Sequence, residues 1–325
     1  DNSKIKILPR DTKNDPEITF RKAKELKKEG VKIVIGPIFH KNLIYLDELK
    51  EMIFLSLTNK NINNPKNIIS AGINANSQIN TIIKFQKLNN INNTIFLIPN
   101  LTFKQEIKKA ILETKIKLKH THVYETNPTL LTKQIEIITR YKQRKNNLRD
   151  EIKRIENSNE INKIKKIEKL KKKDTIGGIN FDSVVIADFD ENLKSIATSL
   201  LYTDVSPKRV YYITLNQWFD KSLLKETSLH PIYFPSINKK NLDEFVDEYQ
   251  NTYGEKPSQL SFLSYDLLGL VYYIIYQNNF EINEKIFYKK NRFKGKVGIF
   301  EINKNKINHI LNFYKIEDQK FKKIF

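Results

Sequence analysis

Short apolar runs alternate with amphipathic stretches along most of the chain. Most runs are β-branched or aromatic and apolar on both faces, as expected of strands buried in a parallel sheet. Because strands that alternate with helices are joined by right-handed crossovers, the pattern predicts an α/β fold of mainly parallel, doubly wound sheets. Seven runs are predicted strands, at residues 5–8, 32–35, 53–57, 93–98, 120–124, 183–187 and 210–215.

The stretches between these runs have helical periodicity. In the first, Asp15 is the predicted N-cap, Pro16 occupies the first turn, and Gly30 suits the left-handed position after the last turn. Its expected inward face consists of Ile18, Ala23 and Leu26, with Phe20 as a further candidate. Further helices are predicted at about 41–50, 75–89, 102–115, 190–203, 240–253 and 259–278.

The strand pattern restarts after residues 95–100, which favours two lobes over one large sheet. Near the C-terminus the chain reads instead as short antiparallel strands, with turns at Asn303–Asn305 and Asp318-Gln319. We therefore expect a first lobe formed by residues 1–100 and 236–290, and a second formed by residues 101–235 and 291–325.

Residues 139–173 have no strand character and predict an inserted helical hairpin with a turn at 156–160. Its narrow apolar seam would be formed by Leu148, Ile152, Ile155, Ile161, Ile164, Ile167 and Leu170. Two interpretations remain open. The hairpin is either a docking arm or anion-binding prong, or a solvated hairpin with lysine-rich outer faces.

The formal net charge of +20 over 325 residues makes nucleic acid a partner to consider. Lysine, asparagine and isoleucine are abundant along the whole chain, however, so the charge reflects a general compositional bias and we expect no specific nucleic-acid binding. The absence of cysteine excludes disulfides and thiolate metal sites. No apolar run approaches the ~20 residues of a transmembrane helix.

Catalytic signatures are missing from the sequence: there is no phosphate-binding loop, no GxGxxG and no nucleophile elbow. His120 and His122 would share one side of a strand, but two histidines make an incomplete metal site. Asp188, Asp190 and Glu191 follow a strand and could bind Mg²⁺ or cap the next helix. Since nothing combines acid, base and nucleophile, we expect no enzyme, no cofactor and no metal.

Open α/β sheets bind ligands beyond the carboxyl ends of their strands. The loops expected there are rich in hydroxyl, amide and aromatic side chains, and helix N-termini nearby favour anionic groups. Two lobes facing each other across such loops would form a cleft that binds a solute reversibly. The loops are residues 36–42, 56–60, 98–103, 187–191 and 214–218.

Four segments resemble the type I periplasmic binding proteins, the family of leucine/isoleucine/valine-binding proteins. Residues 31–60 contain a strand ending in Ile-Gly-Pro, a helix, and a strand ending in a Ser/Thr-rich loop, and 71–100 resembles the next such unit. Residues 253–275, "YGEKPSQLSFLSYDLLGLVYYII", and the hairpin 293–303, "FKGKVGIFEIN", are also similar to family segments.

Residues 181–218, preceded by the charged hairpin, narrow the resemblance to penicillin-binding protein activators, the LpoA-like envelope proteins of proteobacteria. This implies a non-enzymatic regulator that contacts a peptidoglycan synthase. The alternative is a substrate-binding protein that delivers branched-chain amino acids or another small polar solute to an ABC permease. Either implies the periplasm or cell envelope, with a lipoprotein or secretory targeting segment missing from this chain.

The family holds a ligand carboxylate with two early loops and an amine with an acid that follows a later strand. Here the later position offers Leu215, Asn216 and Gln217, which are all uncharged, and Asp188 could substitute from the neighbouring loop. Bulky Phe39 and His40 depart from the small residues usual in the first loop. Tyr265 matches a tyrosine on the hinge side. The cleft lining that the resemblance implies is Ile38, Phe39, His40, Leu57, Thr58, Asn59, Asn100, Phe103, Asp188, Asn216, Trp218 and Tyr265.

One departure concerns the first unit. The family begins with another strand and helix, and that strand normally lies between those corresponding to residues 5–8 and 32–35. Its absence suggests a truncated chain. Otherwise these two strands would pair directly, or the sheet would carry a slot.

Overall fold

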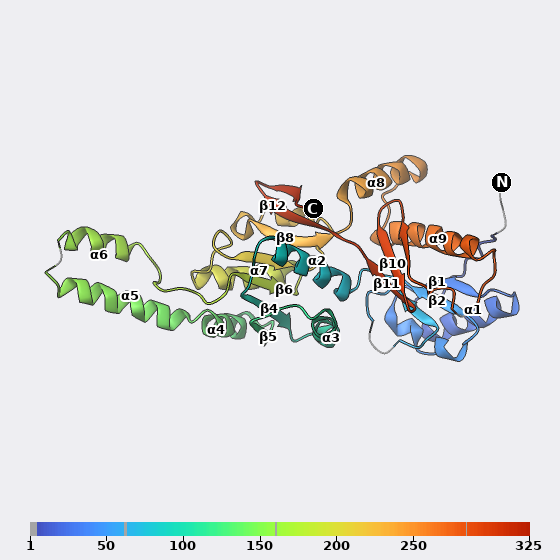
Figure 1. Cartoon of the computed structure of the whole chain (residues 1–325), viewed down its shortest axis with the longest axis horizontal. Coiled ribbons are helices and arrows are strands. Elements are labelled where there is room, and N and C mark those ends of the chain that lie inside the picture. Colours follow the sequence, from blue (N-terminus) through green and yellow to red (C-terminus); the bar gives the residue numbers. More distant parts are fainter. Residues whose placement is uncertain (1–4, 62–63, 160, 284) are drawn as a thin grey trace. The chain divides into compact units, whose positions relative to one another are not determined.

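The computed structural model describes residues 5–61, 64–159, 161–283 and 285–325 (Figure 1). The chain divides into two compact units, each with its own core. Unit 1 comprises Asp1–Thr81, Lys108–Thr114 and Ser236–Asn312. Unit 2 comprises Ile82–Ile107, Lys115–Pro235 and Phe313–Phe325.

Unit 1 contains two small sheets. The first is parallel, with strand order β1-β2-β3, formed by β1 (Ile33–Ile35), β2 (Ile53–Ser56) and β3 (Ile68–Ser70). The second is antiparallel, with order β11-β10-β9, formed by β9 (Asn291–Lys294), β10 (Ile299–Asn303) and β11 (Lys306–His309). Its helices are α1 (Pro16–Lys28), α8 (Lys239–Tyr253) and α9 (Gln259–Gln277), with short 3₁₀ turns η1 (His40–Leu43) and η2 (Leu46–Glu48).

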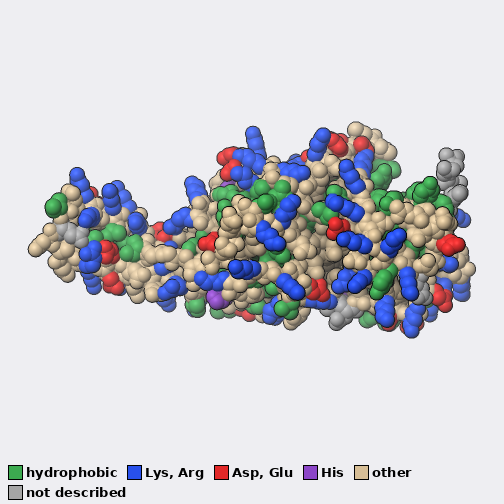
Figure 2. All heavy atoms as spheres, viewed as in Figure 1, with side chains coloured by type: hydrophobic (Ala, Val, Ile, Leu, Met, Phe, Trp, Pro, Cys, Tyr) green, Lys and Arg blue, Asp and Glu red, His purple; other side chains and the backbone are tan. Residues whose placement is uncertain are grey.

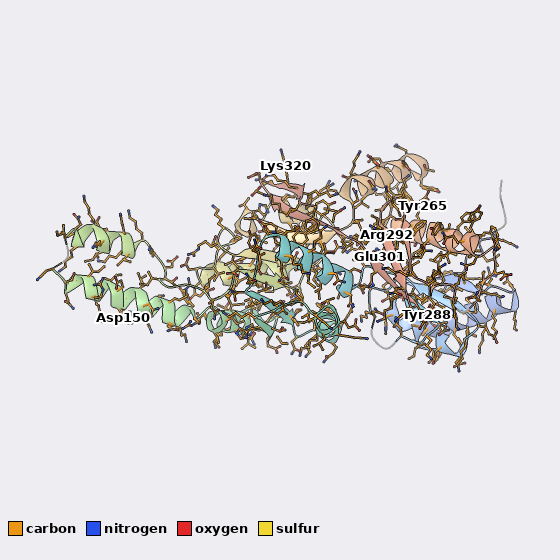
Figure 3. The ribbon with its side chains drawn as sticks, viewed as in Figure 1. Asp150, Tyr265, Tyr288, Arg292, Glu301 and Lys320 are labelled. Atoms are coloured by element: carbon orange, nitrogen blue, oxygen red, sulfur yellow. The ribbon has the colours of Figure 1, made fainter. Side chains whose placement is uncertain are left out.

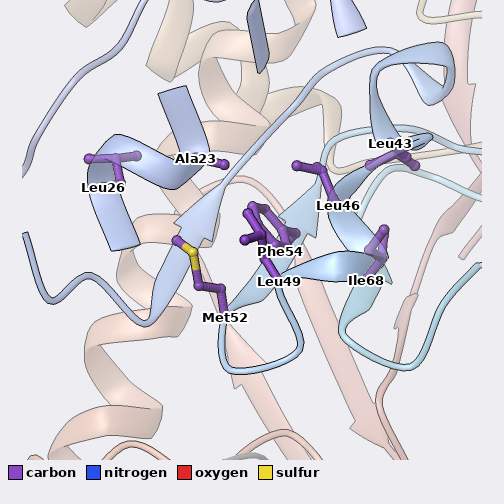
Figure 4. Packing of buried hydrophobic residues seen from close by; sticks show 8 residues of the cluster. All are labelled: Ala23, Leu26, Leu43, Leu46, Leu49, Met52, Phe54 and Ile68. Carbon is purple, nitrogen blue, oxygen red and sulfur yellow. The ribbon is translucent and has the colours of Figure 1, made fainter. Parts of the chain in front are cut away.

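A compact apolar cluster holds α1 and the η1–η2 segment against the parallel sheet (Figure 4). Phe54 of β2, almost fully buried, lies among side chains from α1, η1, η2 and β3. Burial of side chains of this size contributes about 1.5–3 kcal/mol each, so the cluster fixes the strands whose ends carry the predicted loops. Its members are Ala23, Leu26, Leu43, Leu46, Leu49, Met52, Phe54 and Ile68.

Unit 2 is built on a seven-stranded sheet of order β13-β12-β8-β7-β6-β4-β5. The pairs β5–β4, β4–β6, β6–β7 and β7–β8 are parallel, and β12–β13 is antiparallel. The strands are β4 (Thr94–Pro99), β5 (His120–Tyr124), β6 (Ser183–Ile186), β7 (Tyr211–Thr214), β8 (Ile232–Ser236), β12 (Asn312–Glu317) and β13 (Lys320–Lys323). Its helices include α4 (Pro128–Ile138), α5 (Tyr141–Glu156), α6 (Lys163–Lys171) and α7 (Asp190–Tyr202), with 3₁₀ turns η3 (Lys221–Leu224) and η4 (Thr227–Leu229).

Residues of α2 (Ala75–Leu88) and α3 (Lys104–Thr114) are divided between the two units. The division differs from the expected lobe limits at residues 100 and 290. β4 pairs with β5 and β6, so its segment joins unit 2. The β9–β11 sheet belongs to unit 1 because Asn74 Nδ2 donates to the Ile307 carbonyl (3.1 Å) and His309 N donates to Ser77 Oγ (2.9 Å).

The first helix forms as predicted. The Asp15 carboxylate accepts a hydrogen bond from the Ile18 amide at 2.8 Å, Pro16 opens α1, and Gly30 has the left-handed φ of +84°. The predicted helix at 41–50 is wrong, because two 3₁₀ turns replace it. Buried leucines recur there every third residue, at Leu43, Leu46 and Leu49, which suits three residues per turn.

The predicted strand at residues 5–8 is also wrong. This segment is irregular, with Ile7 64% exposed, and of its apolar residues Leu8 packs against the cluster of Figure 4. β1 is the edge of its sheet and pairs with β2. Direct pairing between residues 5–8 and β1 is therefore not present. β3 and β8 are strands that the sequence pattern did not predict.

The inserted hairpin is confirmed as α5 and α6, which pack against each other (Figure 1). Leu148 and Ile155 of α5 are buried in its seam. Ile161 and Ile164 were expected in the seam and are not: they are 86% and 74% exposed. The expected turn at 156–160 includes Glu160, which lies outside the described residues.

Candidate functional site

In unit 1 the two predicted loops follow β1 and β2, and main-chain hydrogen bonds connect them. Gly36 N donates to the Leu55 carbonyl at 2.8 Å, and Leu57 N donates to the Pro37 carbonyl at 3.2 Å. The Gly36-Pro37 peptide is cis, and Gly36 has φ +126°, a conformation that side chains other than hydrogen disfavour. The two hydrogen bonds hold the first residues of the 36–42 loop next to the C-terminal end of β2.

The hydroxyl groups of these loops are engaged internally. Ser56 Oγ donates to the Pro37 carbonyl at 2.7 Å and accepts from Thr58 N at 3.3 Å. Thr58 Oγ1 accepts from Lys60 N at 3.2 Å. Because Ser56 and Thr58 are buried and hydrogen-bonded within the protein, their side chains stabilise the conformation of the loops.

A third loop, after β3, closes tightly on the second. Gly72 N donates to the Thr58 carbonyl at 3.1 Å. A Cβ placed on Gly72 would lie 2.5 Å from the Leu57 carbonyl oxygen, so only glycine allows this approach. Of the six expected unit 1 loop residues, Leu57 and Thr58 are buried, whereas Ile38, Phe39 and Asn59 are exposed and His40 is half-buried.

In unit 2 the centre of the candidate site is Asp188, which follows β6 and is buried. Tyr124, the last residue of β5, donates its hydroxyl to Asp188 Oδ2 at 2.5 Å. Phe189 N donates to Oδ1 at 2.9 Å, and Asn192 Nδ2 lies 3.4 Å from the same oxygen. Each carboxylate oxygen thus accepts at least one hydrogen bond from the protein itself.

The electrostatics follow from this burial. Desolvation raises the pKa of Asp188, and the hydrogen bonds from Tyr124, Phe189 and Asn192 oppose the shift. Desolvation, with the hydrogen bond to Asp188, raises the pKa of Tyr124 far above its ordinary value. Tyr124 and Asp188 thus form a buried polar contact within unit 2.

The β7 loop packs directly against this pair. Gln217 Nε2 donates to the Asp188 carbonyl at 3.1 Å, and Asn216 Oδ1 accepts from Trp218 N at 3.0 Å. Asn216 and Gln217 are buried and Trp218 is half-buried. Trp218 and Phe219 both have left-handed φ angles, 50° and 58°, which turn the chain sharply after β7.

The β4 loop lies on the other side of Asp188. Asn100 N donates to the Tyr124 carbonyl at 2.8 Å, and Asn100 Nδ2 donates to Glu125 Oε1 at 2.9 Å. The rings of Phe103 and Phe189 are 6.4 Å apart at their centroids. The structure therefore brings Asn100, Phe103, Asp188, Asn216 and Trp218 together beyond the carboxyl ends of the parallel strands β4, β6 and β7 of the unit 2 sheet.

Sequence reasoning missed Tyr124 as part of this edge and named Gln217 only as an uncharged residue of the 214–218 loop. The signal for Tyr124 was available, since a polar aromatic residue ends a predicted strand. Its partner Asp188 lies 64 residues away, however, and no local pattern links the two.

Tyr265 lies on the exposed side of α9 in unit 1 (Figure 3). Its ring packs against Phe245 of α8, with centroids 5.6 Å apart. Its expected place in a ligand cleft stays a prediction.

Next to Tyr265, the buried carboxylate of Asp266 organises the turn between β9 and β10. It accepts from the backbone N–H groups of Lys296 (2.7 Å), Val297 (3.0 Å) and Gly298 (2.7 Å). Desolvation raises the pKa of Asp266, and these three donors oppose the shift. A Cβ on Gly295 would lie 2.4 Å from the Asp266 carboxyl carbon, so the turn has a structural role that requires this glycine.

The two β5 histidines share one side of the strand as predicted, with ring centroids 5.9 Å apart. Burial, followed by the neighbouring His120, lowers the pKa of His122. Within the described part of the chain, no group of three or more His, Cys, Asp or Glu side chains is arranged to hold a metal ion. Nor do the described residues include a helix long and apolar enough to span a bilayer.

Solved structures with a similar fold align with nearly the whole chain. The C-domain of LpoA (YraM) from Haemophilus influenzae, described as a regulator of PBP1A, aligns with 100% of this chain and 91% of its own, at 15% identity and a TM-score of 0.64. A branched-chain amino acid ABC transporter protein from Rhodospirillum rubrum aligns over 98% of this chain and 88% of its own, at 12% identity and a TM-score of 0.69.

The chain has the fold of the type I periplasmic binding proteins. A third similar structure is an ABC transporter substrate-binding protein from Desulfitobacterium hafniense in complex with Leu, at 11% identity, with 98% of this chain and 88% of that one covered and a TM-score of 0.59. This chain spans about half (53%) of full-length Haemophilus influenzae LpoA. No family model and no curated protein matches the sequence.

Proposed function

We propose that this protein is a non-enzymatic envelope regulator of the penicillin-binding protein activator type, which acts on peptidoglycan synthesis by contacting a synthase. The observation that carries the proposal is the internal use of the Asp188 carboxylate by Tyr124, Phe189 and Asn192. The similarity to the LpoA C-domain over the whole chain supports it.

The argument rests on what an amino-acid receptor needs. A bound ammonium that leaves water requires a carboxylate partner, because an unpaired buried charge is strongly unfavourable. The loop after β7 offers Asn216 and Gln217, which are uncharged and buried. Asp188, the buried carboxylate near this loop, already accepts hydrogen bonds from Tyr124, Phe189 and Asn192, so a bound ammonium would have to share its oxygens with these donors.

A regulator that acts by contact also needs a surface, and α9 provides one. Its exposed face consists of Tyr265, Leu268, Tyr272 and Tyr276, which we call the α9 tyrosine face. Asp266 is the single charged residue of α9, and it is buried. In a chain of net charge +20, an uncharged helix face 19 residues long suits protein contact, since tyrosine is enriched in protein interfaces.

The test compares ligand binding with partner binding. Thermal unfolding is measured with each of the common amino acids and with small carboxylic acids, and we expect no shift. Binding to purified peptidoglycan synthases from the same organism is measured by calorimetry. We expect one of them to bind and its glycan polymerisation rate to rise.

Variants locate the contact. Tyr272→Ser with Tyr276→Ser should weaken synthase binding at least tenfold, whereas Tyr288→Ser, which alters an exposed tyrosine outside α9, should not. Stabilisation by one amino acid would contradict the proposal and favour the ABC substrate-binding alternative. A ligand at 100 times its Kd adds about 2.7 kcal/mol to the free energy of unfolding, well within detection.

A further inference from the structure

The end of the α5–α6 hairpin exposes two neighbouring isoleucines among lysines. Ile161 precedes Asn162, the N-cap of α6, and Ile164 lies in the first turn of the helix; their side chains are 86% and 74% exposed. Ile167 and Leu170, by contrast, are half-buried toward α5. The hairpin seam therefore accounts for Ile167 and Leu170 and leaves the exposed side chains of Ile161 and Ile164 without a function in the fold.

The charge around this pair has one dominant sign. α6 carries five lysines against one glutamate, and residues 139–173 carry fourteen Lys and Arg against five Asp and Glu. Figure 2 shows Lys and Arg side chains over the hairpin, with hydrophobic patches between them. A surface that is both cationic and apolar is complementary to a surface that is anionic outside and apolar beneath.

The base of the hairpin is fixed, so its end is presented on an anchored arm. Arg144 of α5 is buried and donates from Nη1 to the Thr203 carbonyl (2.9 Å) and from Nη2 to Thr175 Oγ1 (2.7 Å). The Asp204 carbonyl also lies 3.3 Å from Nη2. These contacts tie α5 to the C-terminal end of α7, within unit 2.

We propose that the hairpin end binds the surface of an anionic lipid bilayer, with Ile161 and Ile164 in the boundary between headgroups and acyl chains and the α6 lysines against lipid phosphates. Amphipathic helices with Lys on the polar side and apolar residues on the other bind membranes in this way. Attraction of clustered lysines to anionic lipid adds to the apolar contact.

Lipid fits this surface better than a protein partner does. Protein interfaces are depleted in lysine, and their strongest contacts are Trp, Tyr and Arg. Residues 157–173 contain no Trp, Tyr, Phe, Met or Arg, and seven of the residues from 163 to 173 are lysine. This composition suits phosphate headgroups and aliphatic chains.

The experiment measures sedimentation of the full chain with vesicles of phosphatidylcholine alone or mixed equally with phosphatidylglycerol. We expect binding to the anionic vesicles, little binding to the neutral ones, and an affinity that falls as salt rises from 50 to 300 mM. Ile161→Ser with Ile164→Ser should reduce binding at least tenfold. Lys165→Gln with Lys169→Gln should also reduce it and flatten the salt dependence.

A matched control alters two equally exposed aliphatic residues elsewhere. Leu112→Ser with Ile137→Ser changes side chains that are each 77% exposed, on α3 and α4, and should leave vesicle binding unchanged. Thermal unfolding of every variant verifies that it folds.

Three results would overturn the proposal. The first is no binding to anionic vesicles, and the second is binding that the isoleucine substitutions leave intact, which would indicate general attraction by net charge. The third is equal, isoleucine-dependent binding to an acidic polypeptide, which would indicate a protein partner instead. None of these depends on whether the chain regulates a synthase.

Discussion

His309 Nε2 lies 2.8 Å from the Ala71 carbonyl oxygen and joins the antiparallel β9–β11 sheet to the exit of β3. His309 is buried, and its Nδ1 has no hydrogen-bond partner among the described residues. The ring must therefore be neutral, with its proton on Nε2. Burial lowers the pKa of His309 to about 4 from an ordinary value of 6.5, although the bond to Ala71 opposes the shift.

Unfolding should accordingly become easier in mildly acidic solution. Below pH 6.5 the unfolded chain protonates His309 before the folded chain does, so stability falls from pH 6.5 down to about 4. A shift of this size corresponds to roughly 3 kcal/mol. Urea unfolding at pH 7.5, 5.5 and 4.5 should show this loss in the native chain but not in His309→Gln, which keeps an N–H donor. If the free energy of unfolding changed with pH in the same way in both proteins, His309 would not be the residue responsible for the loss.

Removing the Tyr124 hydroxyl should destabilise unit 2 through Asp188. Tyr124→Phe leaves a buried carboxylate oxygen without its donor, at a cost of about 1–3 kcal/mol. Tyr253→Phe, which alters an exposed tyrosine, should change stability little. In a double-mutant cycle with Asp188→Asn, the two changes should couple by about 0.5–3 kcal/mol in urea unfolding. Strict additivity would show that the contact contributes nothing.

The turn between β9 and β10 allows a comparison of two glycines. Gly295→Ala would place a Cβ 2.4 Å from the Asp266 carboxyl carbon, and we expect a loss of about 1–3 kcal/mol. Gly298→Ala brings its Cβ no closer than 3.6 Å to Asp266, an ordinary contact, and should cost less. Combining Gly295→Ala with Asp266→Ala should remove the steric part of the loss. Equal melting temperatures for the two glycine variants would refute this account.

Arg144 should control how firmly the hairpin is attached. Arg144→Met removes the bonds to Thr203 and Thr175 and leaves their buried oxygens without donors, so hydrogen exchange in α5 and α6 should accelerate. Arg149→Met, on an exposed position of the same helix, is the control. Exchange rates that are unchanged in the Arg144 variant would show that the α5–α6 seam alone holds the hairpin.

Much of the fold was predictable because its local signals agree. β5 occupies the predicted residues 120–124, where β-branched and aromatic side chains are concentrated. The turns at Lys304-Asn305 and Asp318-Gln319 place both residues at left-handed φ, as two-residue hairpin loops require. The hairpin insertion was visible from the loss of strand character alone.

The failures have physical causes. Residues 5–8 alternate as a strand does, but no neighbouring strand is there to pair with them. β3 is three residues long, and β8 contains Pro235, which ordinarily argues against a strand within a sheet. In the candidate site the strand-end rule identified the loops. It could not show that Ser56 bonds to the Pro37 carbonyl or that Asp188 accepts a bond from Tyr124. In each case the two partners are distant in sequence.

The attachment of the hairpin has a consequence for divergence among related chains. Two of the acceptors that Arg144 reaches are main-chain carbonyls, of Thr203 and Asp204, which exist whatever side chains stand at those positions. Arg144 thus fastens the insertion partly through main-chain acceptors, together with the side chains of Thr175 and Asp204. Its remaining surface is free to change in length, charge and partner without disturbing the body that carries it.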